Sequence, residues 1–439
     1  MRRELEIALR ARSTWLVAAV GALLVGHGFV LALDLYSASS RSALASVLQM
    51  EQMDPLAGIV RPTLGGVSLA LSVLGPVIAA RAVAIEKERR TYGSLCLAVG
   101  SSSWVVAQKA LASAAACGLL LVAPGLLFAA LCAGGGHLDP AETAVALGGE
   151  VLHLALVVAL GTAAAACTRT FAQAVTLGVV ASLTSWAIDA AEGFAALAWL
   201  GGASAWSIEH RLLPFQHGVL SLSSVLWLSC ASALALAVAM VAGSFAPASK
   251  KVGRAVAIIG TGVVTLLSIG PEGRALDLSE QRRASLPPDI VAALRRLAGP
   301  ISVDVFLDRD DSRRRQLELD VLSRLRLARP DLLIQMPLDE ASEVAEGQHG
   351  GEDAEYGRIV VRAGAATRET RSSSGREIVR VIFEAAAQEM PAWAPLAYPG
   401  FPIVVSGALR RGLGLLAYLG LPSCLVLMGL ALTHGRTTR

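Results

Sequence analysis

The chain has 439 residues, of which 54% are hydrophobic and only 17% are charged. Soluble domains carry about 25% charged residues, so this composition excludes an ordinary soluble protein and predicts a multi-span membrane protein. The formal net charge of +3 gives no reason to expect a nucleic-acid partner.

Eight apolar stretches match the length of about 17–25 residues that a helix needs to cross a bilayer. They are residues 13–33, 63–80, 110–133, 143–167, 171–188, 220–245, 255–270 and 412–433. The seventh is the weakest, because it is short and carries Gly260, Gly262 and Gly270. A polar stretch, residues 271–409, separates the last two. We therefore expect a mainly α polytopic membrane protein with a small α/β domain inserted before the last helix.

The distribution of Lys and Arg predicts the orientation of the spans, because cytoplasmic loops retain basic residues. With the N-terminus inside, the short outer loops hold only Arg41, Arg61 and Arg211. Both termini are then cytoplasmic and residues 271–409 lie outside. If the seventh segment does not span, the inserted domain is cytoplasmic instead.

The N-terminal residues 1–15 carry the pattern of an amphipathic helix. Leu5, Ala8 and Leu9 share one helical face, and charged residues lie largely opposite. This pattern predicts a helix lying at the inner membrane interface.

The charged segment over residues 81–110, between the second and third spans, is the longest inner loop. Its charges are concentrated in Glu86, Lys87, Glu88, Arg89 and Arg90, and an apolar run and a serine cluster follow. Charge alone is equally consistent with an ordinary solvated loop.

The order of residues in this segment resembles the cytoplasmic loop of type-2 ABC transporter permeases. In that loop a charged E-R-R-x-G-T-like segment opens a short amphipathic stretch that ends at a Lys beside the third span. The matching residues are Glu88, Arg89, Arg90, Gly93, Ser94, Leu95 and Lys109. The chain departs from the pattern in the additional Tyr92 and in Ser94, which stands where Thr is usual. The resemblance implies that residues 86–90, Gly93 and Lys109 couple the spans to a separate cytoplasmic ATPase.

Two later segments resemble proteins of the gliding-motility type of these permeases. Before the sixth span, the matching residues are His210, Phe215, Gly218, Val219 and Leu220. After the seventh, a pattern resembles the start of the extracytoplasmic auxiliary subunit that accompanies such permeases. Its residues are Arg274, Asp277, Leu278, Ser279, Ser285, Leu286, Leu294, Leu297 and Pro300. The chain thus resembles a six-span permease (1–245) joined by a seventh helix (246–270) to an auxiliary domain (271–409) and its C-terminal anchor (410–439).

The resemblance implies a transporter subunit of the bacterial inner membrane that is not itself an enzyme. The chain has no G-x-x-x-x-G-K-[ST] loop and no H-E-x-x-H motif, so ATP and Mg would be bound by the partner ATPase. A second permease copy or a paralogue would complete the assembly, and the outer domain would contact substrate or an envelope protein. The alternative is a non-transporting scaffold that anchors the outer domain for assembly of envelope or motility machinery.

Glu150 and His153 are ionisable residues inside the fourth span, three positions apart and hence on one helical face. A charge at the bilayer centre costs about 2.5–3.5 kcal/mol on insertion scales, so such residues face a partner or an aqueous path. Interhelical bonding is the favoured interpretation, a substrate path the second, and a metal site is not expected because no second ligand set is evident.

The inserted stretch reads as a small α/β domain. Residues 301–307 alternate as a half-buried strand does, and a helix follows with Leu317, Val321 and Leu325 on one face. Further strands and a helix over residues 377–390 complete the order β-α-β-β-β-α. This order resembles a thioredoxin-like or flavodoxin-like sheet without redox cysteines, since none of the six cysteines lies in this stretch.

Overall fold

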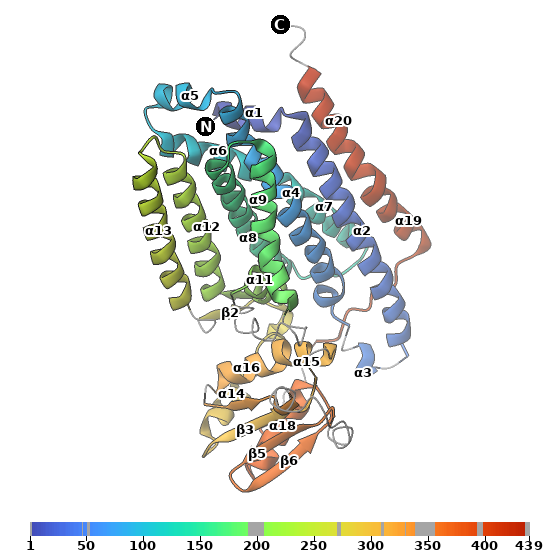
Figure 1. Cartoon of the computed structure of the whole chain (residues 1–439). Helices are drawn as coiled ribbons and strands as arrows, with labels where there is room; N and C mark the ends of the chain where they lie inside the picture. Colours follow the sequence, from blue (N-terminus) through green and yellow to red (C-terminus); the bar gives the residue numbers. More distant parts are fainter. Residues whose placement is uncertain are drawn as a thin grey trace, which may run out of the picture. The chain divides into compact units, whose positions relative to one another are not determined.

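The computed structural model describes residues 2–45, 47–50, 53–191, 206–269, 274–308, 311–329, 331–338, 356–392 and 398–434. The chain forms two compact units. The first is a helical bundle, and the second includes Gln281–Ala397. Each unit is described by itself below (Figure 1).

Within the described residues, eight helical segments are long and apolar enough to cross a membrane. They are Arg12–Ala43, Leu56–Glu88, Ser102–Ala133, Pro140–Cys167, Phe171–Ile188, Leu222–Ala242, Ala248–Ser268 and Gly407–Leu432. The prediction of eight helices long and apolar enough to cross a membrane is therefore confirmed, which is compatible with a multi-pass membrane protein. The first helix continues ten residues past the predicted end at Leu33, because its polar last turns bond to a segment near the C-terminus, as described below.

The bundle contains several elements besides simple spans. In chain order, it comprises α1 (Arg2–Leu9), α2 (Arg12–Ala43), α3 (Val47–Met50), η1 (Leu56–Val60), α4 (Arg61–Glu88), α5 (Tyr92–Val99), α6 (Ser102–Cys117), α7 (Leu119–Ala133), α8 (Pro140–Cys167), α9 (Phe171–Ala191), α11 (Ile208–Gln216), β1 (Val219–Ser221), α12 (Leu222–Ala242), α13 (Ala248–Ser268), β2 (Ala275–Asp277), α19 (Gly407–Leu415), η6 (Leu416–Gly420) and α20 (Leu421–His434). Helices α6 and α7 form one span interrupted at Gly118. The amphipathic helix expected at the N-terminus is α1.

The last span packs on the first, so it is part of the bundle and more than an anchor. The buried core that contains Phe29 and Leu64 also contains Ala417 and Leu421. Figure 1 shows α20 running alongside α2. The approach is close at Gly26, where an added Cβ would lie 2.9 Å from the carbonyl oxygen of Ala417. Small residues at a helix crossing allow this approach between membrane helices.

Replacing Gly26 with Val is expected to lower the stability of the bundle by about 1–3 kcal/mol, because the added methyl groups overpack the crossing of α2 and η6. Thermal unfolding of the detergent-solubilised protein measures this loss. Gly65→Val is the matched control, because an added Cβ there meets no atom within 4 Å. Equal melting temperatures for the two variants would contradict the crossing described here.

The second unit is built on a four-stranded sheet with the order β4-β3-β5-β6. Its strands are β3 (Ile301–Val305), β4 (Leu333–Gln335), β5 (Ile359–Ala363) and β6 (Ala366–Thr370). Strands β3 and β4 are parallel, whereas β5 and β6 are antiparallel to their neighbours. A flavodoxin-like sheet is wholly parallel in its core, so the mixed sheet excludes that alternative. It keeps the expected order of strands and helices, β-α-β-β-β-α.

The helices of this unit bury their apolar faces against the sheet in one core. They are α14 (Pro288–Arg296), α15 (Ser312–Leu317), η4 (Glu318–Leu322), α16 (Ser323–Ala328) and α18 (Gly375–Ala385). Ile301, Val303 and Val305 alternate with polar residues and lie in the core with Leu317 and Leu325 of the intervening helices. The unit is narrower than the predicted range 271–409, because residues 274–280 and 398–409 belong to the bundle.

Candidate functional site

The charged segment after the second span is a helix end followed by a second short helix. The prediction of a loop starting at residue 81 is wrong for Glu86, Lys87 and Glu88, which lie in the last turn of α4. The chain turns at Arg90, whose φ of 56° is left-handed, and α5 then runs from Tyr92 to Val99. Ser101 caps the next helix by accepting a hydrogen bond from the Trp104 amide at 3.2 Å. The apolar Leu95 and the glycine at 93 therefore lie on a helix.

Lys109 is buried in α6, with a side chain only 3% exposed. Its ammonium nitrogen lies 2.9 Å from Glu4 Oε2 and 3.6 Å from Glu86 Oε1. Glu4 belongs to α1 and Glu86 to α4, so one cation joins three helices. Lys109 is thus an internal link at this end of the bundle and offers no surface to a partner.

Lys87 and Glu88 bond to the turn between α8 and α9. Lys87 Nζ donates to the carbonyl oxygens of Ala165 at 2.9 Å and Thr168 at 3.0 Å, which lie at the C-terminus of α8. Carbonyl groups at that end of a helix have no intrahelical partner, and a cation satisfies them. Glu88 Oε1 accepts from the Phe171 amide, the first residue of α9, at 2.6 Å. The end of α4 is therefore bonded to both helices.

Helix α5 is held to the bundle by Tyr92, the residue that departs from the permease pattern. Tyr92 is buried, and its hydroxyl donates to the carbonyl oxygen of Gly243, at the C-terminus of α12, at 3.1 Å. Burial raises the pKa of Tyr92 well above its usual range, so the phenol stays protonated and remains a donor. The sequence carried no signal for this contact, since the two residues are far apart in the chain.

Exposed apolar and basic residues lie on α5, in the turn before it and at the start of α6. Leu97 is 83% exposed and Trp104 is 58% exposed. Arg89, Arg90 and Val99 are also exposed. We call these five residues the α5 patch. Of the predicted coupling residues, Arg89 and Arg90 belong to this patch, whereas Glu86, Lys87 and Lys109 are bonded inside the bundle.

Glu150 and His153 form a buried polar network between α8 and α4. Both side chains are only 1% exposed. Ser68 Oγ donates to Glu150 Oε1 at 2.7 Å, and His153 Nε2 lies 3.3 Å from Ser72 Oγ. His153 Nδ1 lies 3.3 Å from the second carboxylate oxygen of Glu150. The geometry is that of interhelical bonding, the favoured interpretation from the sequence, and in this conformation the pair is closed off from solvent.

The two segments noted for their resemblance to gliding-motility proteins pair with each other at the opposite end of the bundle from α5. Strand β1 is antiparallel to β2, with Val219 opposite Asp277 and Leu220 opposite Leu276. The pairing extends to Leu278, whose amide donates to the Gly218 carbonyl at 3.0 Å. Sequence reasoning treated the segments separately, and the structure brings them into one sheet.

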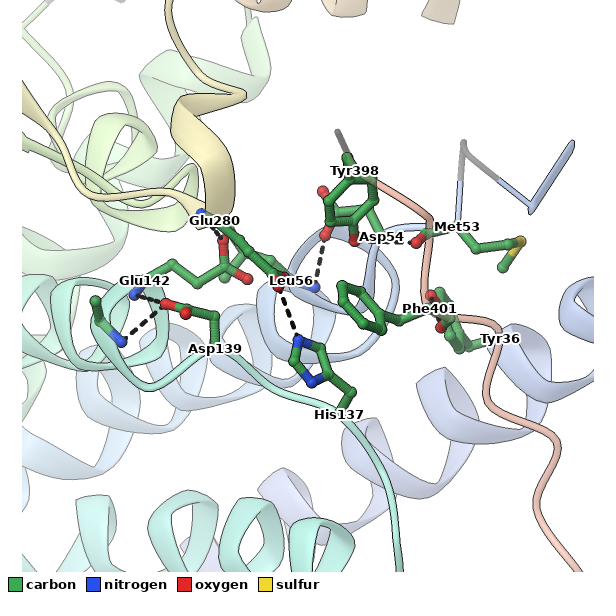
Figure 2. Close-up of polar contacts among 11 residues, drawn as sticks. Tyr36, Met53, Asp54, Leu56, His137, Asp139, Glu142, Glu280, Tyr398 and Phe401 are labelled. Atoms are coloured by element: carbon green, nitrogen blue, oxygen red, sulfur yellow. Dashed lines mark hydrogen bonds and ion pairs between the residues drawn. The ribbon is translucent and has the colours of Figure 1, made fainter. Parts of the chain in front are cut away.

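The chain segments that flank the second unit are both bonded to the bundle, and they converge on His137 (Figure 2). On the first segment, the Glu280 amide donates to Glu142 Oε2 at 2.9 Å, and Glu280 Oε1 lies 3.0 Å from His137 Nε2. On the second segment, the Phe401 ring stacks on the His137 ring, with centroids 3.6 Å apart. We call this region, residues 274–280 and 398–405 with His137, the linker junction.

The second segment of the linker junction is also bonded to the first span. Tyr36 Oη donates to the Phe401 carbonyl at 2.9 Å. Ser40 Oγ and Ser37 Oγ accept from the amides of Ile403 and Val405 at 3.0 and 3.1 Å. These contacts explain why α2 extends beyond its apolar stretch: its polar last turns are part of the linker junction.

Comparison with known proteins yields no relative. No family model, no curated protein sequence and no solved structure matches the chain.

Proposed function

We propose that this chain is the membrane-spanning subunit of an ATP-driven transporter, of the type-2 ABC permease class and related to the gliding-motility type. The feature that carries the proposal is the α5 patch. It is a set of exposed apolar and basic residues on and beside a short helix that is bonded to the ends of several spans. A partner that binds such a helix has a direct mechanical connection to the bundle.

The contacts of α5 support a role in coupling. Tyr92 connects α5 to the end of α12, and the turn at Arg89–Thr91 connects it directly to α4. Lys87 and Glu88 then connect the end of α4 to α8 and α9. A displacement of α5 by a cytoplasmic ATPase would therefore act on four spans. In this proposal α1, α5 and both termini lie in the cytoplasm of a bacterial cell, and a second copy or a paralogue completes the assembly in the inner membrane.

The linker junction supports a connection between the bundle and the inserted domain. A movement of α2 or α8 is passed to both chain segments that lead into the inserted domain, through Tyr36 and Glu142 respectively. We place that domain outside the cell, where it would contact substrate or an envelope protein. The non-transporting scaffold remains the alternative, and it needs the linker junction but not the α5 patch.

The test is affinity purification of the whole chain from its native host in mild detergent, followed by an ATPase assay of the proteins that co-purify. A P-loop ATPase in stoichiometric amount is expected. Replacing Leu97 with Glu is expected to lower ATPase recovery by about tenfold or more, because a charge placed in a desolvated interface costs more than 1.4 kcal/mol.

The matched control is Leu333→Glu, which changes an apolar residue that is 57% exposed in the second unit. It should leave ATPase recovery unchanged. If the Leu97 variant recovers as much ATPase as the wild type, the α5 patch is not the binding surface for the ATPase. A stable complex with envelope proteins and no nucleotide hydrolysis would favour the scaffold.

A further inference from the structure

Arg211 is a buried cation of the bundle. It lies in α11, its side chain is among the largest that are fully buried, and the residue is only 2% exposed. Among the described residues, its side chain donates one hydrogen bond, from Nη2 to the Ile269 carbonyl at 3.3 Å, and Nε has no acceptor there. Within the part of the chain that the structure describes, no carboxylate forms an ion pair with Arg211. Burial lowers the pKa of this guanidinium, as expected where no anion offsets the lost hydration.

Two tryptophans complete the surroundings of Arg211. The guanidinium carbon lies 5.3 Å from the ring centroid of Trp206 and 5.5 Å from that of Trp227. Cation–π contacts stabilise the charge but satisfy no N–H group. Trp227 itself is 7% exposed, and its indole Nε1 also has no acceptor in the part of the chain that the structure describes. Two buried donors, on adjacent side chains, therefore lack partners within the described residues.

The group that best fits these two donors is an acceptor that is also an anion. A buried donor without a partner is costly, and a buried charge without a counterion more so. A water molecule can accept from one or both donors, but it brings two hydrogens of its own and does not offset the charge. An anion with several oxygens satisfies Nε and Nε1 together and neutralises the guanidinium. Arginine matches the geometry of phosphate and carboxylate groups.

The position of Arg211 indicates where this anion comes from. Ile269 directly follows α13, a helix with no buried residues whose apolar side chains, such as Val256 and Val264, are exposed. Those side chains face lipid if the helix crosses the membrane. The acceptor of Arg211 thus lies where a lipid-facing helix ends, at the depth of the headgroups. Tryptophan is enriched at that depth. Trp206 is partly exposed, so a ligand would reach Arg211 from the side on which Trp206 lies.

We propose that Arg211, with Trp227 Nε1, binds the phosphate group of a phospholipid headgroup at the end of the bundle that carries β2. The phosphodiester oxygens accept from Arg211 and from the indole, and the acyl chains lie along α12 and α13. Phosphate binding at Arg211 is independent of the transport activity proposed above. An inorganic or small soluble phosphate has the same chemistry, and the test separates the two sources.

The experiment measures the melting temperature of the full chain, purified in detergent and stripped of lipid, on addition of defined ligands. The ligands are dioleoyl phosphatidylglycerol, dioleoylglycerol (the same acyl chains without phosphate) and inorganic phosphate. Only phosphatidylglycerol is expected to raise the melting temperature of the wild type. Native mass spectrometry of the unstripped protein should show one tightly retained phospholipid per chain.

The variants identify the binding groups. Arg211→Gln should weaken the apparent affinity for phosphatidylglycerol by about tenfold or more, because it removes a hydrogen bond to a charged group. Trp227→Phe keeps the ring but removes the indole donor, and a smaller loss is expected. Arg211→Lys keeps the charge and should retain part of the binding. The control is Arg410→Gln, which removes an exposed arginine paired with Asp34 and should leave the affinity unchanged.

Each result decides the proposal. Equal stabilisation by dioleoylglycerol, or equal phosphatidylglycerol affinity in the wild type and Arg211→Gln, would overturn it. Stabilisation by inorganic phosphate as strong as by phosphatidylglycerol would overturn the lipid source and leave a site for a soluble phosphate. If Arg211→Gln does not fold, the Trp227→Phe and Arg211→Lys titrations still decide whether the two donors bind the ligand.

Discussion

Replacing Glu150 alone with Leu is expected to destabilise the bundle by about 3–5 kcal/mol, the cost of removing one member of a buried pair. The change leaves His153 Nδ1 and Ser68 Oγ without their partner in a site that is only 1% exposed. Replacing Glu150 and His153 together with Leu is expected to restore most of the lost stability. Apolar residues of similar volume can substitute for a buried pair, and the two serines can bond to their own helix backbone.

The measurement is thermal unfolding of both variants in detergent, together with the ATPase activity of the assembled complex. The pair of readouts separates the two interpretations of this site. If Glu150 and His153 only join α4 and α8, the double variant regains both stability and activity. If they line a substrate path, it regains stability and stays inactive. A single Glu150 variant as stable as the wild type would contradict the network described here.

Replacing Lys109 with Met is expected to cost about 2–3 kcal/mol and to release α1 from the bundle. Breaking a fully buried pair costs about 3–5 kcal/mol. The expected loss here is smaller, because the side chains of Glu4 and Glu86 are 14% and 29% exposed and therefore partly solvated. Thermal unfolding measures the stability. Limited trypsin digestion at Arg2 and Arg3 reports the release of α1, since the cleavage rate follows the population of the opened state.

The control for Lys109 is Lys250→Met, which removes an exposed lysine near the start of α13. It should change neither the melting temperature nor the cleavage rate. Adding Glu4→Gln to the Lys109 variant should recover part of the stability, because it removes one of the two carboxylates left without a counterion. If trypsin cleaves α1 in the Lys109 variant as slowly as in the wild type, the ion pair does not hold that helix.

The order of elements in this protein was readable from local patterns in the sequence. The spans follow from the length of each apolar stretch, α1 from a 3.6-residue period, and the strand β3 from alternation. Each of these signals depends on residues that are close in the chain. The extent of the helices was less certain, because α2 and α4 continue through polar residues that only distant partners stabilise.

The tertiary structure decided which charged and polar residues are internal. Lys109 stands just before the predicted third span, where the sequence predicts a coupling residue, yet its partner Glu4 lies 105 positions away. Tyr92 bonds to a carbonyl 151 positions away, and Tyr36 to one 365 positions away.

A single sequence carries no information on such pairs, because hydrogen bonds and burial depend on distances that only packing sets. For Arg211 and Trp227 the sequence shows two ordinary interfacial residues, and only packing reveals that each buries a donor nitrogen for which the described residues provide no acceptor. The apolar pattern by itself therefore determined the membrane bundle and the inserted domain, while the α5 patch, the linker junction and the Arg211 site follow from contacts between distant segments.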